Sequence, residues 1–125
     1  MNAIVVIEDS PTQAQLIAAH LAGLGFEVFN AYDGPEGLQM IDNVRPDAVV
    51  LDVNLPSMNG VQVCRRIKRD QRVAHIPVIM LTSADGSDDI LQGLDAGASD
   101  YIPKTSVAFE KLTATLEAIG LLVAD

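Results

Sequence analysis

The sequence predicts an α/β fold, a doubly wound arrangement of one five-stranded parallel β-sheet with helices on both faces. Short runs of β-branched and other apolar residues alternate along the chain with segments whose apolar residues recur at helical spacing. This alternation is typical of a parallel sheet built from repeated β–α units. The chain has 125 residues and no long Pro-, Gly- or Ser-rich tract, so we expect a single domain over residues 1–125.

Five strands are expected, at residues 3–8, 26–31, 47–52, 77–82 and 99–102. Three of these runs, the first, third and fourth, are nearly continuously apolar, as expected when helices cover both faces of the sheet. The last run is the weakest and predicts a short strand.

The first two helices have recognisable starts. Ser10 can cap the first, Pro11 fits its first helical position and Gln13 completes a capping box. The second follows the sequence DGPEG at 33–37, where proline again suits a first turn. The expected inward residues are Ile17, Leu21 and Leu24 in the first helix, and Leu38 and Ile41 in the second.

The other three helices follow from a cap and from apolar spacing. Asn59 can cap the third helix, whose inward residues are Val61, Cys64 and Ile67. The fourth runs from about Ser87 through Ile90, Leu91 and Leu94 to a stop near Gly97. The last is expected to pack along one side of the sheet through Phe109, Leu112, Leu116, Ile119 and Val123.

The composition excludes several classes of protein. A net charge of −9 disfavours autonomous binding to nucleic acid, which depends on Lys and Arg at the phosphates, so a protein partner is expected. The one concentrated basic segment, RRIKRD at 65–70, is interpreted as a solvated helix face. No apolar stretch is long enough to span a membrane and no signal peptide pattern opens the chain, so we expect cytoplasmic residence without membrane insertion. Cys64 is the only cysteine and is expected to be a small buried hydrophobe.

Three acids fall where two of the predicted strands stop. Glu8 and Asp9 end the first apolar run and Asp52 ends another, so neighbouring parallel strands would bring them to one rim of the sheet. Carboxylates so close together repel, which favours a cation among them, and Mg²⁺ suits hard oxygen ligands. Thr82 and Lys104 follow two further strands and should face the acids. Phosphoryl transfer to an aspartate requires such a set of nucleophilic carboxylate, metal site, hydroxyl and ammonium group.

These residues stand in four motifs, which are IEDS at 7–10, VVLDVNLPSMNG at 49–60, MLTSAD at 80–85 and DAGASDYIPK at 95–104. With these motifs in this order, the chain closely resembles the receiver domain of two-component response regulators, of the stand-alone chemotaxis-regulator type, over essentially its whole length. The resemblance implies a flavodoxin-like sheet with the strand order 2-1-3-4-5. It also implies a phosphorylation-activated signalling switch that is not a turnover enzyme but assists its own phosphorylation and dephosphorylation.

The resemblance assigns roles to individual residues. Asp52 would accept a phosphoryl group from a sensor histidine kinase or a phosphotransfer protein. Thr82 would hydrogen-bond one phosphoryl oxygen, and Lys104 would pair with another. Mg²⁺, for which Mn²⁺ or another divalent cation can substitute, would be held by Asp9, Asp52, the backbone carbonyl of Asn54 and, through water, Glu8. The positions two past Asp52 and two past Thr82, Asn54 and Ala84, would border the path of an attacking water.

An aspartyl phosphate adds about two negative charges at the rim at neutral pH and can therefore drive a conformational change. Thr82 moving toward the phosphoryl group would vacate space that Tyr101 could turn inward to fill, so these two are the expected switch residues. The surface of the fourth helix, fifth strand and fifth helix would then control a downstream protein. With no output domain in this chain, we expect the signal to leave by protein contact, from a monomer or a weak phosphorylation-dependent dimer.

One local departure from the family pattern concerns the residue after the lysine. Many receiver domains have proline there, often after a cis peptide, whereas Pro103 precedes Lys104 here and Thr105 follows it. A cis bond before a non-proline residue costs about 3 kcal/mol, so a trans peptide is expected. His20 and His75 are expected to be packing or surface residues away from the rim.

Three other functions remain open. A flavodoxin-type electron carrier would need a phosphate-binding loop after the first strand, where EDSPTQAQ is acidic. An aspartate-based phosphatase would use a second acid two residues after its nucleophile, where this chain has Asn54, and turnover of an external phosphoester would favour it. A phosphorylation-independent binding module would have no physical need for the full set of acids, Thr82 and Lys104.

Overall fold

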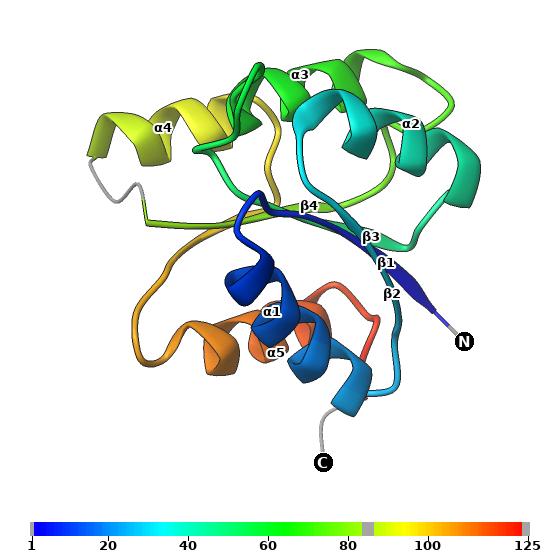
Figure 1. Cartoon of the computed structure of the whole chain (residues 1–125), viewed down its shortest axis with the longest axis vertical. Helices are drawn as coiled ribbons and strands as arrows, with labels where there is room; N and C mark the ends of the chain where they lie inside the picture. The colour runs from blue at the N-terminus through cyan, green and yellow to red at the C-terminus, as the bar shows by residue number, and fades with distance from the viewer. Residues whose placement is uncertain (1, 84–86, 124–125) are drawn as a thin grey trace.

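A computed structural model of the chain describes residues 2–83 and 87–123, with side chains from 2 to 83 and from 90 to 123. Strands and helices alternate through this part of the chain (Figure 1). The strands are β1 (Ala3–Ile7), β2 (Glu27–Ala31), β3 (Ala48–Leu51), β4 (Val78–Thr82) and β5 (Asp100–Pro103). The helices are α1 (Pro11–Gly23), α2 (Gly34–Val44), α3 (Gly60–Arg69), α4 (Ser87–Asp95) and α5 (Ala108–Ala118).

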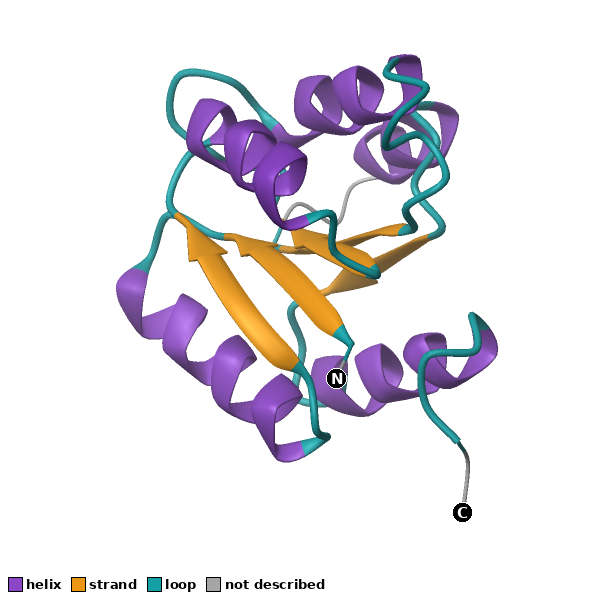
Figure 2. Ribbon diagram, turned by 90° about the vertical axis from the view of Figure 1, so that its right-hand side faces the viewer, coloured by secondary structure: helices purple, strands orange, loops and turns teal. Residues whose placement is uncertain are grey.

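All strand pairs are parallel, and the order across the five-stranded sheet is β2-β1-β3-β4-β5. The predicted fold class and strand order are therefore confirmed. Helices α2, α3 and α4 lie on one face of the sheet and α1 and α5 on the other, so the molecule has three layers (Figures 1 and 2). The chain enters the sheet at β1 and winds outward in both directions. The winding changes direction at β1 and β3, and the carboxyl ends of the strands at such a point are where sheets of this kind bind ligands.

The core consists of two layers, one on each side of the sheet. Alternate residues of each central strand belong to opposite layers, because successive side chains of a strand point to opposite faces. In β1, Val5 and Ile7 pack under α2, α3 and α4, whereas Ile4 and Val6 pack against α1 and α5. All four are fully buried. This explains why the central strands read as continuous apolar runs rather than alternating ones.

Both predicted N-cap residues, Ser10 and Asn59, cap their helices, but only Asn59 is part of a capping box. Asn59 caps α3 in a complete capping box, accepting from Gln62 N–H at 3.0 Å while its own N–H donates to Gln62 Oε1 at 3.1 Å. Ser10 does cap α1, accepting from Gln13 N–H at 3.4 Å. The predicted capping box at Ser10 is wrong, however, because the Ser10 N–H donates to Glu8 Oε2 at 3.2 Å instead. The carboxylate two residues upstream takes the place that Gln13 was expected to fill.

Helix α4 exposes two leucines, and helix α5 is shorter than predicted. Leu91 and Leu94 on α4 are 64% and 46% exposed, whereas Ile90 and Gly93 lie on the side toward the sheet. Helix α5 ends at Ala118 and does not reach Val123, which is 92% exposed.

The end of α5 has a specific cause in a Schellman motif at Gly120. This residue has φ +85°, and its N–H donates to Glu117 O at 3.1 Å, while Leu121 N–H donates to Leu116 O at 2.9 Å. These two hydrogen bonds satisfy carbonyls of the last turn and turn the chain away from the helix axis. The glycine was therefore the sequence signal for the stop, and the apolar spacing beyond it was misleading.

Candidate functional site

Backbone hydrogen bonds at the ends of the central strands fix the residues of the candidate site. Asp52 N–H donates to Ile7 O at 3.0 Å, which sets Asp52 directly beside the two acids that follow β1. On the far side of β3, Lys104 N–H donates to Thr82 O at 2.9 Å. Both bonds extend the parallel ladder by one residue, so the positions of these side chains follow from the register of the sheet.

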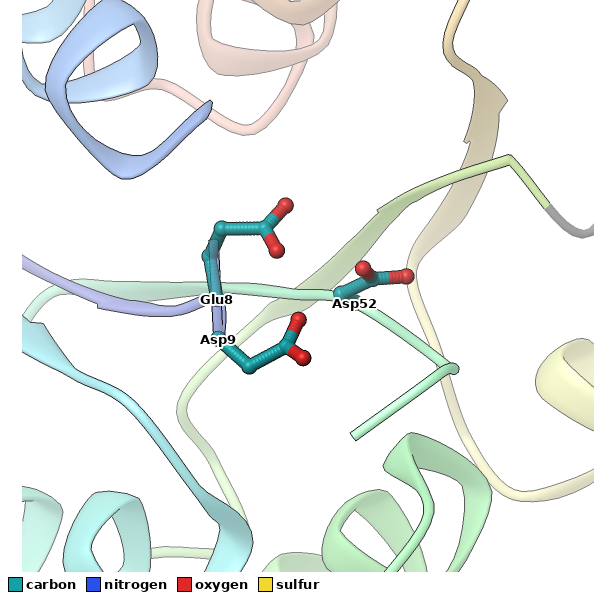
Figure 3. A group of neighbouring side chains, drawn as sticks. All are labelled: Glu8, Asp9 and Asp52. Carbon is teal, nitrogen blue, oxygen red and sulfur yellow. The ribbon is translucent and has the colours of Figure 1, made fainter. Parts of the chain in front are cut away.

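The structure brings the three predicted acids together. Carboxylate oxygens of Glu8, Asp9 and Asp52, one from each residue, all lie within 4.8 Å of one another. Figure 3 shows the three carboxyl groups gathered at the ends of β1 and β3. Glu8 and Asp52 are only 2% and 6% exposed, while Asp9 is exposed. Two of the three carboxylates are thus deeply placed, and the third is open to solvent.

Lys104 reaches into the same cluster. Its ammonium group donates to Glu8 Oε1 and, at 3.3 Å, to Asp52 Oδ2. The sequence did not predict the contact with Glu8. The other oxygens of the two buried acids accept backbone hydrogen bonds, from Ser10 N–H to Glu8 and from Asn54 N–H to Asp52 at 3.2 Å each.

The pKa values of Glu8 and Lys104 are shifted by burial and by the contacts of the Lys104 ammonium group with two carboxylates, those of Glu8 and Asp52. Burial raises the pKa of Glu8, and the charge of Asp52 adds to this rise, against the lowering effect of Lys104 and of the Ser10 N–H. Burial by itself would lower the pKa of Lys104, but its hydrogen bond to Glu8 and the charge of Asp52 outweigh burial, so the pKa is raised. Lys104 is therefore firmly protonated, and it leaves the carboxylate cluster incompletely neutralised.

The donor set fits a divalent cation. Three carboxylates within 4.8 Å of one another, with one ammonium group against two of them, leave a formal excess of negative charge at this rim of the sheet. Hard oxygen ligands in this number and with one side open to water are what Mg²⁺ prefers in proteins. Asp9, the exposed acid, has no hydrogen bond or ion pair within the described part of the chain, so its carboxylate is available as a ligand.

The start of α3 packs closely against the backbone of Asp52 and Val53. The first residue of α3, Gly60, donates its N–H to Val53 O at 2.8 Å, and a Cβ at this position would lie 2.1 Å from the carbonyl oxygen of Asp52. Only a residue without a side chain allows α3 to begin this close to the strand end that carries Asp52. This role of Gly60 was not predicted from the sequence, although the residue belongs to the VVLDVNLPSMNG motif.

The remaining predicted residues lie partly as expected. Thr82 is fully buried at the end of β4, next in the sheet to the strand that leads to Asp52. Tyr101 is already inside, at 9% exposure, among Met80 and the backbone of Gly93. An inward Tyr101 is the position that the switch hypothesis expects after Thr82 moves, and the movement itself stays a prediction. Ala84, expected near an attacking water, lies outside the described residues.

Three expectations about residues near or away from the site are confirmed. The bond before Thr105 is trans, since the described part of the chain has no cis peptide. His20 is a packing residue of α1, with its ring stacked on Phe109 and its Nε2 2.8 Å from Thr113 Oγ1. His75 is exposed in the segment before β4. Neither histidine reaches the rim.

Comparisons with known proteins identify relatives of this chain. Residues 4–117 match the profile of the response regulator receiver domain. The chain is 43% identical over 101 residues to the response regulator PleD of Caulobacter vibrioides. The aligned region covers 81% of this chain and 22% of that protein. Other curated relatives, at about 40% identity, are also longer, and the chain spans less than half the length of each of these relatives.

Solved structures show the same fold. The BeF3-activated N-terminal receiver domain of RstA from Klebsiella pneumoniae superposes with a TM-score of 0.86 at 35% identity, covering 94% of this chain and 97% of that one. Chemotaxis protein CheY4 of Vibrio cholerae superposes with a TM-score of 0.86 at 28% identity, covering 95% and 98%. Among the described helices, none has the length and apolar character that crossing a membrane requires.

Proposed function

The chain belongs to the response regulator receiver domain family, and from this we propose that it is a switch in which Asp52 accepts a phosphoryl group from a phosphohistidine. Receiver domains are signalling switches of two-component systems rather than turnover enzymes. We propose that residues 1–125 form one such domain. Its phosphodonor would be a sensor histidine kinase or a phosphotransfer protein, and its target a downstream protein.

The placement of Asp52 carries the proposal. An acid that is only 6% exposed at the end of a central strand is costly unless it is paired or bound, and here it accepts from Lys104 Nζ and from Asn54 N–H. In the transfer, a carboxylate oxygen of Asp52 attacks phosphorus, the P–N bond to the donor imidazole breaks, and the imidazole leaves with the electron pair of that bond. The product is a mixed anhydride on Asp52.

We propose Asp9, Asp52, the backbone carbonyl of Asn54 and, through water, Glu8 as the residues that hold Mg²⁺, or Mn²⁺ in its place. When bound, the metal supplies positive charge that brings the nucleophile and the phosphoryl oxygens together despite their repulsion. Asp9 is the ligand that this proposal places nearest to solvent.

Lys104 and Thr82 act on the phosphoryl group from the other side. Lys104 already donates to Asp52 Oδ2, so its ammonium group is positioned to pair with a phosphoryl oxygen once that carboxylate is phosphorylated. Thr82, at the end of the adjacent β4, would donate a hydrogen bond to another phosphoryl oxygen. With these groups in place, the domain would assist both its own phosphorylation and the later hydrolysis.

The proposed switch involves Thr82 and Tyr101, both of which are buried in the structure. We propose that phosphorylation shifts a population toward an inward Tyr101 and a Thr82 drawn to the phosphoryl group, rather than creating a new rotamer. The surface of α4, β5 and α5 would report that shift to the target, from a monomer or a weak phosphorylation-dependent dimer.

The test is the intact mass of the protein after incubation with acetyl phosphate and Mg²⁺. We expect a single phosphoryl adduct that disappears in Asp52→Asn and in the presence of a chelator. Because an aspartyl phosphate can hydrolyse before detection, binding of beryllofluoride is followed in parallel by NMR. An adduct that persists in Asp52→Asn would overturn the assignment, and multiple turnover of an external phosphoester would indicate a phosphatase instead. Neither adduct nor beryllofluoride binding would indicate a phosphorylation-independent module.

A further inference from the structure

A basic hollow lies on α3, outside the acidic site. It has a volume of about 300 Å³ and is lined by Ser57, Met58, Gln62, Arg65, Arg66 and Arg69. None of these residues is acidic, and three carry guanidinium groups. In a chain of net charge −9 with only eight Lys and Arg residues, three arginines around one hollow are a pronounced local concentration of positive charge.

The arginines of this α3 hollow have weaker ion pairing than Arg45 and Arg72. Among the residues whose side chains are described, Arg66 and Arg69 make no ion pair, and Arg65 reaches only Asp95, at 3.8 Å. The Asp95 side chain is 82% exposed, so this contact is weak. By contrast, the nearby Arg45 pairs with Asp42 at 3.0 Å, and Arg72 with Asp70 at 2.9 Å.

The position of the arginines in the last turns of α3 has a simpler explanation, which does not account for all of the observations. Cations at a helix C-terminus interact favourably with the helix dipole. Lys68 already serves the same region, donating to Ala74 O at 3.1 Å and to Ile76 O at 2.6 Å. Dipole compensation does not require three arginines to line one concave space, and it does not require that space to extend to Ser57 and Met58.

We propose that the α3 hollow binds a small molecule through a phosphate group, such as a phosphate monoester or a nucleotide. A phosphate monoester carries nearly two negative charges and three strong acceptor oxygens at neutral pH, which suits two or three neighbouring arginines better than a single carboxylate does. The volume is at the lower end of the range for small-ligand sites and favours a compact ligand over an extended surface. The acidic remainder of the chain weakens long-range attraction, but screening over about 8 Å at physiological ionic strength leaves the local field of the arginines.

The test is an NMR titration of the ¹⁵N-labelled chain with adenosine monophosphate in chelator-containing buffer without Mg²⁺. Adenosine serves as the phosphate-free comparison, and sodium chloride at matched ionic strength controls for screening. We expect saturable amide shifts at the residues lining the hollow with adenosine monophosphate only. In Arg66→Gln/Arg69→Gln the dissociation constant should rise about tenfold or more, because two charge-assisted hydrogen bonds are lost.

The matched control is Arg45→Gln/Lys111→Gln, which removes the same charge outside the hollow and should change the dissociation constant less than about twofold, since remote exposed charges are screened. Three results would overturn the proposal: shifts reproduced by sodium chloride, equal shifts with adenosine, or shifts confined to the rim around Lys104. If only long anionic polymers such as heparin shift these amides, the face binds an extended polyanion rather than a small ligand. The spectra report folding of each variant directly, and no step depends on phosphorylation of Asp52, so this proposal and the proposed function fail separately.

Discussion

Gly60→Ala is expected to damage both the fold and the site, because α3 begins against the backbone of the strand end that carries Asp52. A Cβ at position 60 would lie 2.1 Å from the carbonyl oxygen of Asp52 and 2.8 Å from the Cα of Val53. Both are backbone atoms, which cannot rotate away as the end of a side chain can. The helix start or the strand end must therefore move.

The size of the effect follows from two opposing contributions. Overpacking a well-packed interior costs about 1–3 kcal/mol in the free energy of unfolding, and a rigid backbone contact belongs at the upper end of this range. Replacing glycine by alanine inside a helix returns up to about 1 kcal/mol. We therefore expect Gly60→Ala to lose roughly 2 kcal/mol, a shift of about 1 M in the midpoint of urea unfolding.

The assay is urea unfolding followed by far-ultraviolet circular dichroism, with Gly23→Ala as the matched control. Gly23 also lies in a helix, α1, but a Cβ there would meet no atom within 4 Å, so the control should be neutral or more stable than the wild type. Gly60→Ala should also give less phosphoryl adduct under the conditions proposed for Asp52. If the free energy of unfolding of Gly60→Ala lies within about 0.5 kcal/mol of the wild type, the close-approach argument is refuted.

Two further predictions concern stability. Asn59→Ala should lower the free energy of unfolding by about 1 kcal/mol, and Ser10→Ala by less, because only the Asn59 cap is part of a complete capping box; equal losses in urea unfolding would contradict this reading. Burial raises the pKa of the Cys64 thiol above its usual 9.0, so the unfolded chain releases this proton first and stability falls as the pH rises above 9.0. Cys64→Ala should remove this contribution, and an unchanged slope between pH 8 and pH 10 in urea unfolding would place its source elsewhere.

The fold and the residues of the candidate site could be predicted because both depend on local sequence patterns. The apolar runs specify the strands. The residues at or just after their ends, which are acids, a threonine and a lysine, specify the chemical groups at the carboxyl edge of the sheet. Once Glu8, Asp9 and Asp52 follow neighbouring parallel strands, their meeting at one rim is a consequence of the topology. The order of the motifs along the chain was enough to indicate the family.

The predictions for the end of α5 and for the capping box of α1 were wrong because two local sequence signals competed in each segment. Apolar spacing continued past Gly120, but a glycine in the left-handed region ended α5. Gln13 was predicted to complete a capping box with Ser10, but the Ser10 N–H donates to the Glu8 carboxylate instead.

By itself, the sequence determined which elements form, in what order, and which chemical groups stand at their ends, because hydrophobic periodicity and turn residues act over short stretches of chain. Only the tertiary structure decided which groups share partners. Lys104 lies between Glu8 and Asp52, which are 96 and 52 positions away along the chain, and the arginines of α3 border a common hollow with Ser57. Such contacts depend on the register of strands and the approach of helices, which are fixed by packing the whole core at once and are not encoded in any single segment.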